Sequence, residues 1–464
     1  MKKLWLLFLA LALAVLNMPA LAQETTSADS MEDMNAAIGN LTSKVNALAA
    51  KGPAVEFHGF VQSDIINDST ESFNETVGDG KVQVGGVPAG SNGWTQFSLR
   101  NSRIDLLAKD STADWNFKGY IETDFLGSSN GVTVGGNEYK FYTQPTLRLR
   151  HAYVEGDTND GWQILAGQYW TLFGWNMDYV LNTVAEAPVM GTLYERIPQL
   201  RFQKTLGDAN GAQVQIAASA EKPDQDISQM PTLDLGIRFL MNDIKGRFCS
   251  ATGAGKLMPL SIGLSERNAD YYWNANGGST LNQNIWASAV AADVLLPVMP
   301  ASEGKDDPSI VISGEYTYGA GDTLPFNGGG FGGVAAIGSY GNGAPNYGAS
   351  GGVGTELDGG EAGVVNGGLT PILLESYNGQ IQIFLPPSIG TIVTAGYGEV
   401  FAINDVTLGG TYDDDSNIFV NAMQDLNKEV RVGLEYSQYW THYTTATNNN
   451  PTDQRLQLST WYRF

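Results

Sequence analysis

The chain has 464 residues and a formal net charge of −23, because 49 acidic side chains outnumber 26 basic ones. Nucleic-acid binding needs a basic surface that neutralises phosphates, so this charge argues against DNA or RNA as a partner. The single cysteine, Cys249, excludes an intrachain disulfide. The 56 glycines, 20 tyrosines and 10 tryptophans are what a β-barrel with many turns and two aromatic girdles requires.

Residues 1–22 have the pattern of a secretory signal peptide. Two lysines precede an apolar run over residues 4–15, and Ala20-Leu21-Ala22 fits the small-x-small cleavage rule. A membrane anchor helix is the alternative, but the run is short for a membrane span. We therefore expect export from the cytoplasm and cleavage after Ala22.

Residues 24–51 are predicted to form a short coiled-coil helix in the periplasm. Apolar side chains recur there with the alternating spacing of a heptad seam, at Met31, Met34, Ile38, Leu41, Val45 and Leu48. A seam this short is marginal alone, so another element has to hold the helices together. A single amphipathic helix that lies on another surface remains the alternative.

Beyond this segment, short stretches of alternating apolar and polar residues predict an all-β fold, a 16-stranded antiparallel transmembrane β-barrel over 55–464. The clearest stretch is 115–125, whose polar face carries charges of both signs, as is typical of a water-filled lumen. Its apolar face carries Trp115, Phe117, Ile121 and Phe125.

Short turns and long loops alternate between the predicted strands, which is the pattern of outer-membrane barrels. In the first strand the apolar residues change phase near Gly59. The sixteen predicted segments are 55–64, 96–108, 115–125, 146–156, 162–170, 199–206, 211–221, 232–241, 257–265, 284–295, 309–319, 373–385, 389–402, 416–424, 428–440 and 454–464.

The last predicted strand runs to the final residue, Phe464. Its apolar-leaning face consists of Leu456, Leu458, Thr460, Tyr462 and Phe464, and its mostly polar face of Gln457, Ser459, Trp461 and Arg463. A terminal strand that ends on an aromatic residue looks like the assembly signal of outer-membrane barrels. We therefore expect this strand to close the barrel and the barrel-assembly machinery to be a partner.

Two of the long connections have a distinctive composition. The segment of about 171–198 is too rich in aromatic and apolar residues to extend into water, so we expect it to fold into the barrel as a constriction. Its candidate constriction residues are Asp178, Glu186 and Glu195. The Gly-rich segment of about 320–371 is predicted to be an external loop, because it lacks the Lys-Ser/Thr and the strand-to-helix context of a phosphate-binding loop.

Basic residues are concentrated in the first half of the barrel, where they predict a cationic stripe on one wall of the lumen. Arg148 and Arg150 share a face, whereas Arg100 and Arg103 can both face inward only across a bulge. The candidate pore and substrate-path residues are Arg100, Arg103, Lys118, Arg148, Arg150, Arg196 and Arg201. The stripe favours a ladder for small anions such as dicarboxylates, and the alternative is that it pairs with wall carboxylates, namely Asp105, Glu122, Asp124 and Glu155.

No catalytic or metal-binding pattern is present. The three histidines, His58, His151 and His442, have no metal-ligand spacing, and no Gly-x-Ser-x-Gly sequence occurs. We therefore expect neither a cofactor, nor a metal, nor an enzymatic activity; a hydrolase that uses His151 on the lipid-facing side is the alternative.

Several short sequence motifs, taken in their order along the chain, resemble those of a known protein family. They are Phe57-His58-Gly59-Phe60-Val61, Ser102-Arg103-Ile104, 118–125, Leu147-Arg148-Leu149-Arg150-His151-Ala152-Tyr153, 165–173 and 196–202. Together with the preceding heptads they resemble the DcaP-like porins, closely over 31–206 and loosely beyond.

The resemblance implies a homotrimer of sixteen-stranded barrels with periplasmic N-terminal helices, which admits small anionic solutes such as dicarboxylates. By position it also implies a substrate path past Arg100, Arg103, Arg148, Arg150 and Arg201. We therefore expect a porin in the outer membrane of a Gram-negative bacterium, surrounded by its lipid. A barrel that tethers the outer membrane to periplasmic partners, or a general cation-tolerant porin, is the alternative.

Overall fold

The computed structural model describes residues 53–77, 81–127, 146–178, 183–185, 189–223, 230–274, 282–321, 362–365, 368–404, 412–444 and 450–464. The chain divides into two units, Met1–Ala54 and Val55–Phe464, and the second contains the barrel. The signal peptide and the coiled coil predicted over 1–22 and 24–51 lie outside the described residues, as does most of the segment 320–371.

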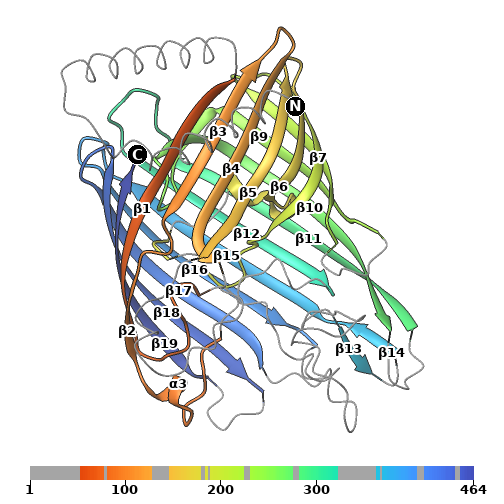
Figure 1. The fold of residues 1–464 in the computed structure, drawn as a ribbon, viewed down its shortest axis with the longest axis vertical. Coiled ribbons are helices and arrows are strands. Elements are labelled where there is room, and N and C mark those ends of the chain that lie inside the picture. Colours follow the sequence, from red (N-terminus) through yellow and green to blue (C-terminus); the bar gives the residue numbers. More distant parts are fainter. Residues whose placement is uncertain are drawn as a thin grey trace, which may run out of the picture. The chain divides into compact units, whose positions relative to one another are not determined.

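The described strands form one closed antiparallel barrel (Figure 1). Its strands are β1 (Ala54–Asp68), β2 (Trp94–Ser98), β3 (Arg103–Ser111), β4 (Trp115–Gly127), β5 (Thr146–Thr158), β6 (Trp162–Trp170), β7 (Arg196–Gly207), β8 (Ala212–Glu221), β9 (Thr232–Phe248), β10 (Lys256–Asn274), β11 (Asn282–Met299), β12 (Ser309–Ala320), β15 (Leu373–Phe384), β16 (Thr391–Ala402), β17 (Tyr412–Asp425), β18 (Val430–Tyr443) and β19 (Thr452–Arg463). Because β2 and β3 both pair with β1, they occupy one position, and the described residues give sixteen positions in the barrel. The predicted fold class and strand number are confirmed.

The other described elements are short. Strands β13 (Ala362–Val365) and β14 (Gly368–Pro371) form a separate hairpin inside the segment predicted to be a loop. Helix α3 (Pro88–Ser91) lies between β1 and β2, and the 3-10 helix η3 (Phe173–Asp178) follows β6. Within the described ranges, no helix is long and apolar enough to cross a membrane.

The last strand closes the barrel, as the sequence predicts. Strand β19 pairs antiparallel with β1 over nine residue pairs, from Phe60 opposite Arg463 to Asp68 opposite Arg455. Beyond them, the N–H of Gly59 donates to the carbonyl of Phe464 at 3.1 Å, and the N–H of Phe464 donates back at 3.0 Å. The terminal residue is therefore part of the ladder, which leaves no open sheet edge at this seam.

Side chains of the barrel alternate between an apolar outer face and a polar inner face. On β19, Leu458 and Tyr462 are exposed on the outside, whereas Gln457 and Ser459 are buried on the inside. An apolar outer band is what contact with lipid requires. Trp461 departs from this rule, because it lies on the inner face and is fully buried.

The two ends of the barrel differ in the length of their connections. At one end, which we call the turn end, lie Phe464 and the short connections 112–114, 159–161, 208–211, 249–255, 300–308, 385–390 and 426–429. The opposite end, which we call the loop end, carries longer connections such as 69–93 and 171–195. In outer-membrane barrels the short turns face the periplasm and the long loops face outward.

Candidate pore-lining site

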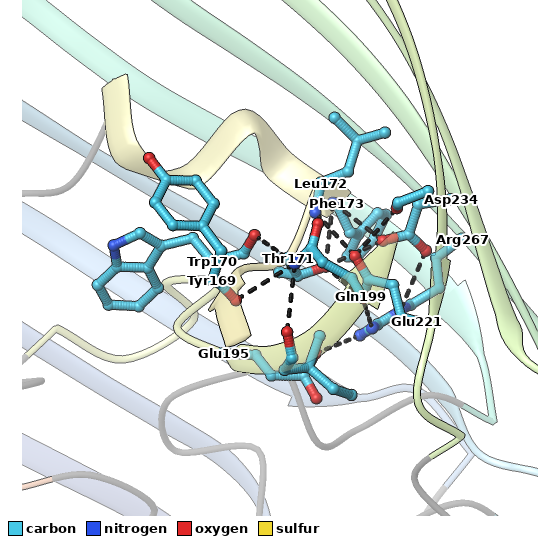
Figure 2. A network of polar contacts seen from close by, with 12 residues as sticks. Tyr169, Trp170, Thr171, Leu172, Phe173, Glu195, Gln199, Glu221, Asp234 and Arg267 are labelled. Carbon is cyan, nitrogen blue, oxygen red and sulfur yellow. Dashed lines mark hydrogen bonds and ion pairs between the residues drawn. The ribbon is translucent and has the colours of Figure 1, made fainter. Parts of the chain in front are cut away.

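The segment that follows β6 is held inside the barrel by one buried arginine. Arg267 of β10 contacts Glu221 of β8 at 2.8 Å, Asp234 of β9 at 3.3 Å and Glu195, which precedes β7, at 2.6 Å. Arg267, Glu221 and Asp234 are fully buried, so this ion cluster is shielded from water (Figure 2). The cluster attaches the end of the segment to the wall formed by β8, β9 and β10.

The start of the same segment binds the same carboxylates. The Thr171 hydroxyl donates to Glu221 at 3.0 Å and to Asp234 at 2.9 Å, and the Leu172 N–H donates to Glu221 at 3.1 Å (Figure 2). The Thr171 N–H also donates to the Glu195 carbonyl at 3.1 Å. Both ends of the segment are thus fixed at one place on the wall, and we call its described residues between Thr171 and Glu195 the inner segment.

Further along, backbone N–H groups of the inner segment bind inward-facing side chains of distant strands. Val184 donates to Glu435 of β18 at 2.9 Å, Met190 to Asn417 of β17 at 2.9 Å and Leu193 to Glu315 of β12 at 3.2 Å. These side chains take the place of water for the loop backbone, whose groups would otherwise be buried without partners. The inner segment therefore follows the inner wall from β8 to β18.

The apolar side chains of the inner segment are buried rather than exposed. Leu172, Phe173 and Leu193 are fully buried, and the Trp175 indole N–H donates to the Leu264 carbonyl at 3.3 Å. Trp175 has a positive φ of 46°, which is uncommon for a bulky residue. The guanidinium of Arg238 lies 4.7 Å from the centroid of the Trp175 ring and helps to hold this conformation.

Only one of the three predicted constriction residues has a described side-chain contact. Asp178 is the last residue of η3, Glu186 lies outside the described residues, and Glu195 binds Arg267.

The opposite wall carries the predicted cationic residues. Arg150 of β5 contacts Glu122 of β4 at 2.5 Å and Asp124 at 2.8 Å, while Arg103 of β3 lies 3.9 Å from Glu122. Arg148 donates from Nε to Asp124 at 3.0 Å. The structure thus brings together three arginines of β3 and β5 with two carboxylates of β4, the strand between them, in a group that we call the arginine belt.

Three cations on this wall reach water. The exposed fraction of the side chain is 35% for Arg148, 36% for Lys118 and 28% for Arg100, whereas it is 1% for Arg150. Each is paired with a carboxylate: Asp124 for Arg148, Glu155 for Lys118 at 2.5 Å and Glu75 for Arg100. The wall pairing that the sequence offered as an alternative is therefore present, and it leaves these cations partly accessible.

An interruption of the second strand position explains how Arg100 and Arg103 both come to the inside. Strand β2 ends at Ser98 and β3 begins at Arg103, while Leu99 between them is 61% exposed. Arg100 donates to the Phe125 carbonyl at 3.1 Å, and the guanidinium of Arg103 lies 5.5 Å from the ring centroid of Phe60. The sequence predicted that such an irregularity would be needed.

A second irregularity, on β5, adds a histidine to the inner wall. The register between β4 and β5 shifts where Glu122 pairs with His151, so Arg150 is the extra residue and both Arg150 and His151 are buried. The His151 ring lies 5.3 Å from that of Tyr169 and 5.5 Å from that of Trp170. His151 is packed among aromatic rings inside the barrel, which argues against a lipid-facing hydrolase.

Arg196 and Arg201 contact aromatic rings and backbone at the start of β7. The guanidinium of Arg196 lies 4.8 Å from the Trp170 ring centroid and 5.3 Å from that of Tyr194. Arg201 is buried and donates to the Trp170 carbonyl at 2.6 Å. These two arginines therefore hold the junction of β6, β7 and the inner segment, where the Tyr194 hydroxyl also lies 3.5 Å from Arg150.

No local pattern in the sequence indicates the cluster around Arg267, because its four members are separated by many residues and belong to three strands and a loop. Of the predicted wall carboxylates, Asp105 differs from the others, since it contacts His58 at 3.3 Å. Among the described residues, no group of three or more His, Cys, Asp or Glu side chains is placed to hold a metal ion.

The fold is that of known outer-membrane channels. The outer membrane channel DcaP of Acinetobacter baumannii superposes with a TM-score of 0.61 at 18% identity, over 89% of this chain and 98% of that chain. The trimer form of OmpT from Vibrio cholerae and OmpF of Salmonella typhi in complex with daunomycin each give a TM-score of 0.49 at 10% identity; both cover 89% of this chain, and 100% and 98% of their own. No family model and no curated protein matches the sequence. The protein thus has the architecture of a Gram-negative outer-membrane β-barrel, similar to DcaP.

Proposed function

We propose that the protein is an outer-membrane porin, a water-filled channel through which small hydrophilic solutes diffuse passively, with a preference for small anions such as dicarboxylates. The likeness of its fold to the outer membrane channel DcaP supports a channel, and the resemblance of its sequence to the DcaP-like porins supports a homotrimer. The inner segment is proposed to be the constriction.

The observation that carries the proposal is the unequal exposure of the cations. Arg148, Lys118 and Arg100 reach water, while Arg267 of β10 and Arg431 of β18 on the other wall are fully buried and bind carboxylates or backbone. The inner segment covers the wall from β8 to β18 and leaves the cations of β2 to β5 on the side of the passing solute.

The mechanism follows from the chemistry of these groups. A guanidinium offers several donors in a plane that matches a carboxylate. Because Arg148 is accessible and already paired with Asp124, a solute carboxylate can exchange with that partner without losing all its hydrogen bonds at once. Conduction requires sites that are attractive yet weak, and a belt of paired arginines provides them.

The test is the reversal potential of the purified protein in a planar bilayer under a KCl gradient. We expect chloride selectivity that Arg148→Gln weakens and Asp124→Asn strengthens. A unit charge about 4 Å from an ion in water contributes about 1 kcal/mol, so each permeability ratio should change by up to about fivefold. Lys428→Gln, in an exposed turn at the turn end, is the matched control and should change nothing.

Other outcomes separate the alternatives. If the wild-type channel selects potassium and neither variant shifts the potential, the belt only holds the wall together and the channel is a general, cation-tolerant porin. If no conductance develops, the tether interpretation replaces the porin.

A further inference from the structure

The hairpin between β9 and β10 extends beyond its neighbours at the turn end. Strand β9 pairs with β8 only as far as Met241, and past that point Lys245–Phe248 pairs with Lys256–Pro259 of β10 alone. The Lys245 carbonyl accepts from the Ala301 N–H at 2.9 Å. We call residues 245–259 the tip hairpin.

The tip hairpin reaches strands on the far side of the barrel. Gln382, an inward residue of β15, accepts from the Cys249 N–H at 3.4 Å and donates to the Cys249 carbonyl at 3.0 Å. In the order of the closed sheet, β18 lies seven positions from β9 in one direction and nine in the other, so the two are almost opposite. Contacts between the tip hairpin and β18 therefore require it to cross the interior.

Arg431, the second residue of β18, makes those contacts. Its Nη1 lies 3.1 Å from the Ser250 carbonyl, 2.8 Å from that of Ala251 and 3.0 Å from that of Gly253. Asp425 holds the other side of the guanidinium at 2.8 and 2.9 Å. The buried side chain of Arg431 thus donates hydrogen bonds to three carbonyls of the tip hairpin.

Apolar contacts complete the attachment. Cys249 and Ala251 belong to a buried cluster whose other members point inward from β1, β15, β16, β17 and β19 or come from the inner segment, namely Phe60, Val184, Phe384, Ile392, Met423 and Trp461. Apolar side chains that point into a water-filled lumen are unfavourable, but the tip hairpin covers these residues and shields them from water.

We propose that the tip hairpin is a second constriction of the channel, at the turn end, and that Arg431 is the residue that positions it. The inference rests on the proposed porin function. The tip occupies the side of the lumen from β9 to β19 and reaches Phe60 of β1, and the inner segment covers much of the same side. Solutes consequently pass both narrow points along the wall of β2 to β8, which includes the arginine belt.

The native cysteine provides a readout that does not depend on conductance. Cys249 is 2% exposed, and burial raises the pKa of its thiol, so a charged methanethiosulfonate should modify the wild type slowly. Arg431→Gln removes the guanidinium that binds three carbonyls of the tip but leaves Asp425 paired with Arg463 at 2.7 Å. We expect this variant to be modified at least about tenfold faster and to conduct more, whereas Lys428→Gln should behave like the wild type.

Two further variants keep the test independent of Arg431. Replacing 249–255 by Asn-Gly joins Phe248 to Lys256 through a two-residue turn and removes the tip, so single-channel conductance should increase. Gln382→Cys should be joined to Cys249 by a short bis-methanethiosulfonate cross-linker, detected by peptide mapping, because the Gln382 side-chain amide reaches the Cys249 backbone. Ser219→Cys, on the inner face of β8, is the control and should form no cross-link to Cys249.

The outcomes distinguish this inference from the porin function. If the wild type conducts and neither Arg431→Gln nor the shortened variant conducts more, the second constriction is refuted while the porin stands. Rapid modification of Cys249 in the wild type, or no cross-link in Gln382→Cys, refutes the placement of the tip. A wild-type protein without conductance overturns the porin function, and the constriction falls with it even where the cross-link forms.

Discussion

Removing Arg267 should detach the inner segment from the wall. Arg267→Met leaves Glu221 and Asp234 buried without their cation, and breaking a buried ion pair from one side costs about 3–5 kcal/mol. Thr171 and Leu172 keep their hydrogen bonds to these carboxylates, so the lower figure is the better expectation. A loss of about 3 kcal/mol raises the detached population by about 150-fold.

Chymotrypsin is a suitable probe of this population, because its sites Phe173 and Leu193 are buried in the attached state. When opening is fast relative to cleavage, the cleavage rate follows the detached population. We expect the cleavage rate to rise about 100-fold in Arg267→Met. Heat-dependent mobility of this variant on a gel should show that its barrel is still folded. Adding Glu221→Gln and Asp234→Asn removes the orphaned charges and should restore most of the resistance. A single variant as resistant as the wild type would refute the reasoning.

Two further predictions concern the barrel itself. Leu458→Arg places a cation on the lipid face of the closing strand, opposite the outward residues Ile65 and Leu434, and should lower the free energy of unfolding in urea by about 2–4 kcal/mol; an unchanged value would place Leu458 outside the membrane. Gly59→Ala puts a Cβ at 2.5 Å from the Arg103 carbonyl of β3 and at 2.9 Å from the Phe464 ring at the seam, so the folded fraction in vesicles should fall. Gly119→Ala on β4 meets nothing within 4 Å and is the control. Equal folding of the two glycine variants would contradict the tight seam.

The strands could be predicted from the sequence because their pattern is local. Alternation with a period of two requires only neighbouring residues, and the lipid on one side and water on the other impose it along the whole barrel. The face assignments of β4 and β19 follow directly, as does the shared face of Arg148 and Arg150. The alternation does not indicate the bulge beside Arg150, and only through that bulge does His151 join the inner wall.

The packing inside the barrel could not be predicted, because it depends on residues far apart in the chain. Arg267 binds Glu195, and Arg431 binds carbonyls in the turn that follows β9. The alternation along a strand relates only neighbouring residues, so it cannot indicate contacts between residues this far apart. The aromatic composition of the inner segment indicated burial, yet its anchors are mostly backbone N–H groups, which every sequence offers equally.

Large apolar residues on the inner face of the barrel are the one sequence feature that indicates the tip hairpin, and they depart from the usual pattern of a polar lumen. Phe60 lies where the apolar residues of β1 change phase, and Trp461 lies on the polar face of β19, so both place large apolar groups inside. Full burial of an inward indole means that protein, not water, fills the lumen beside it. At a cost of about 25 cal/mol per Å² of apolar surface left in water, inward aromatic residues in a predicted barrel indicate a segment that crosses the lumen at their level. Here that segment is the tip hairpin, whose Cys249 and Ala251 pack in the same cluster.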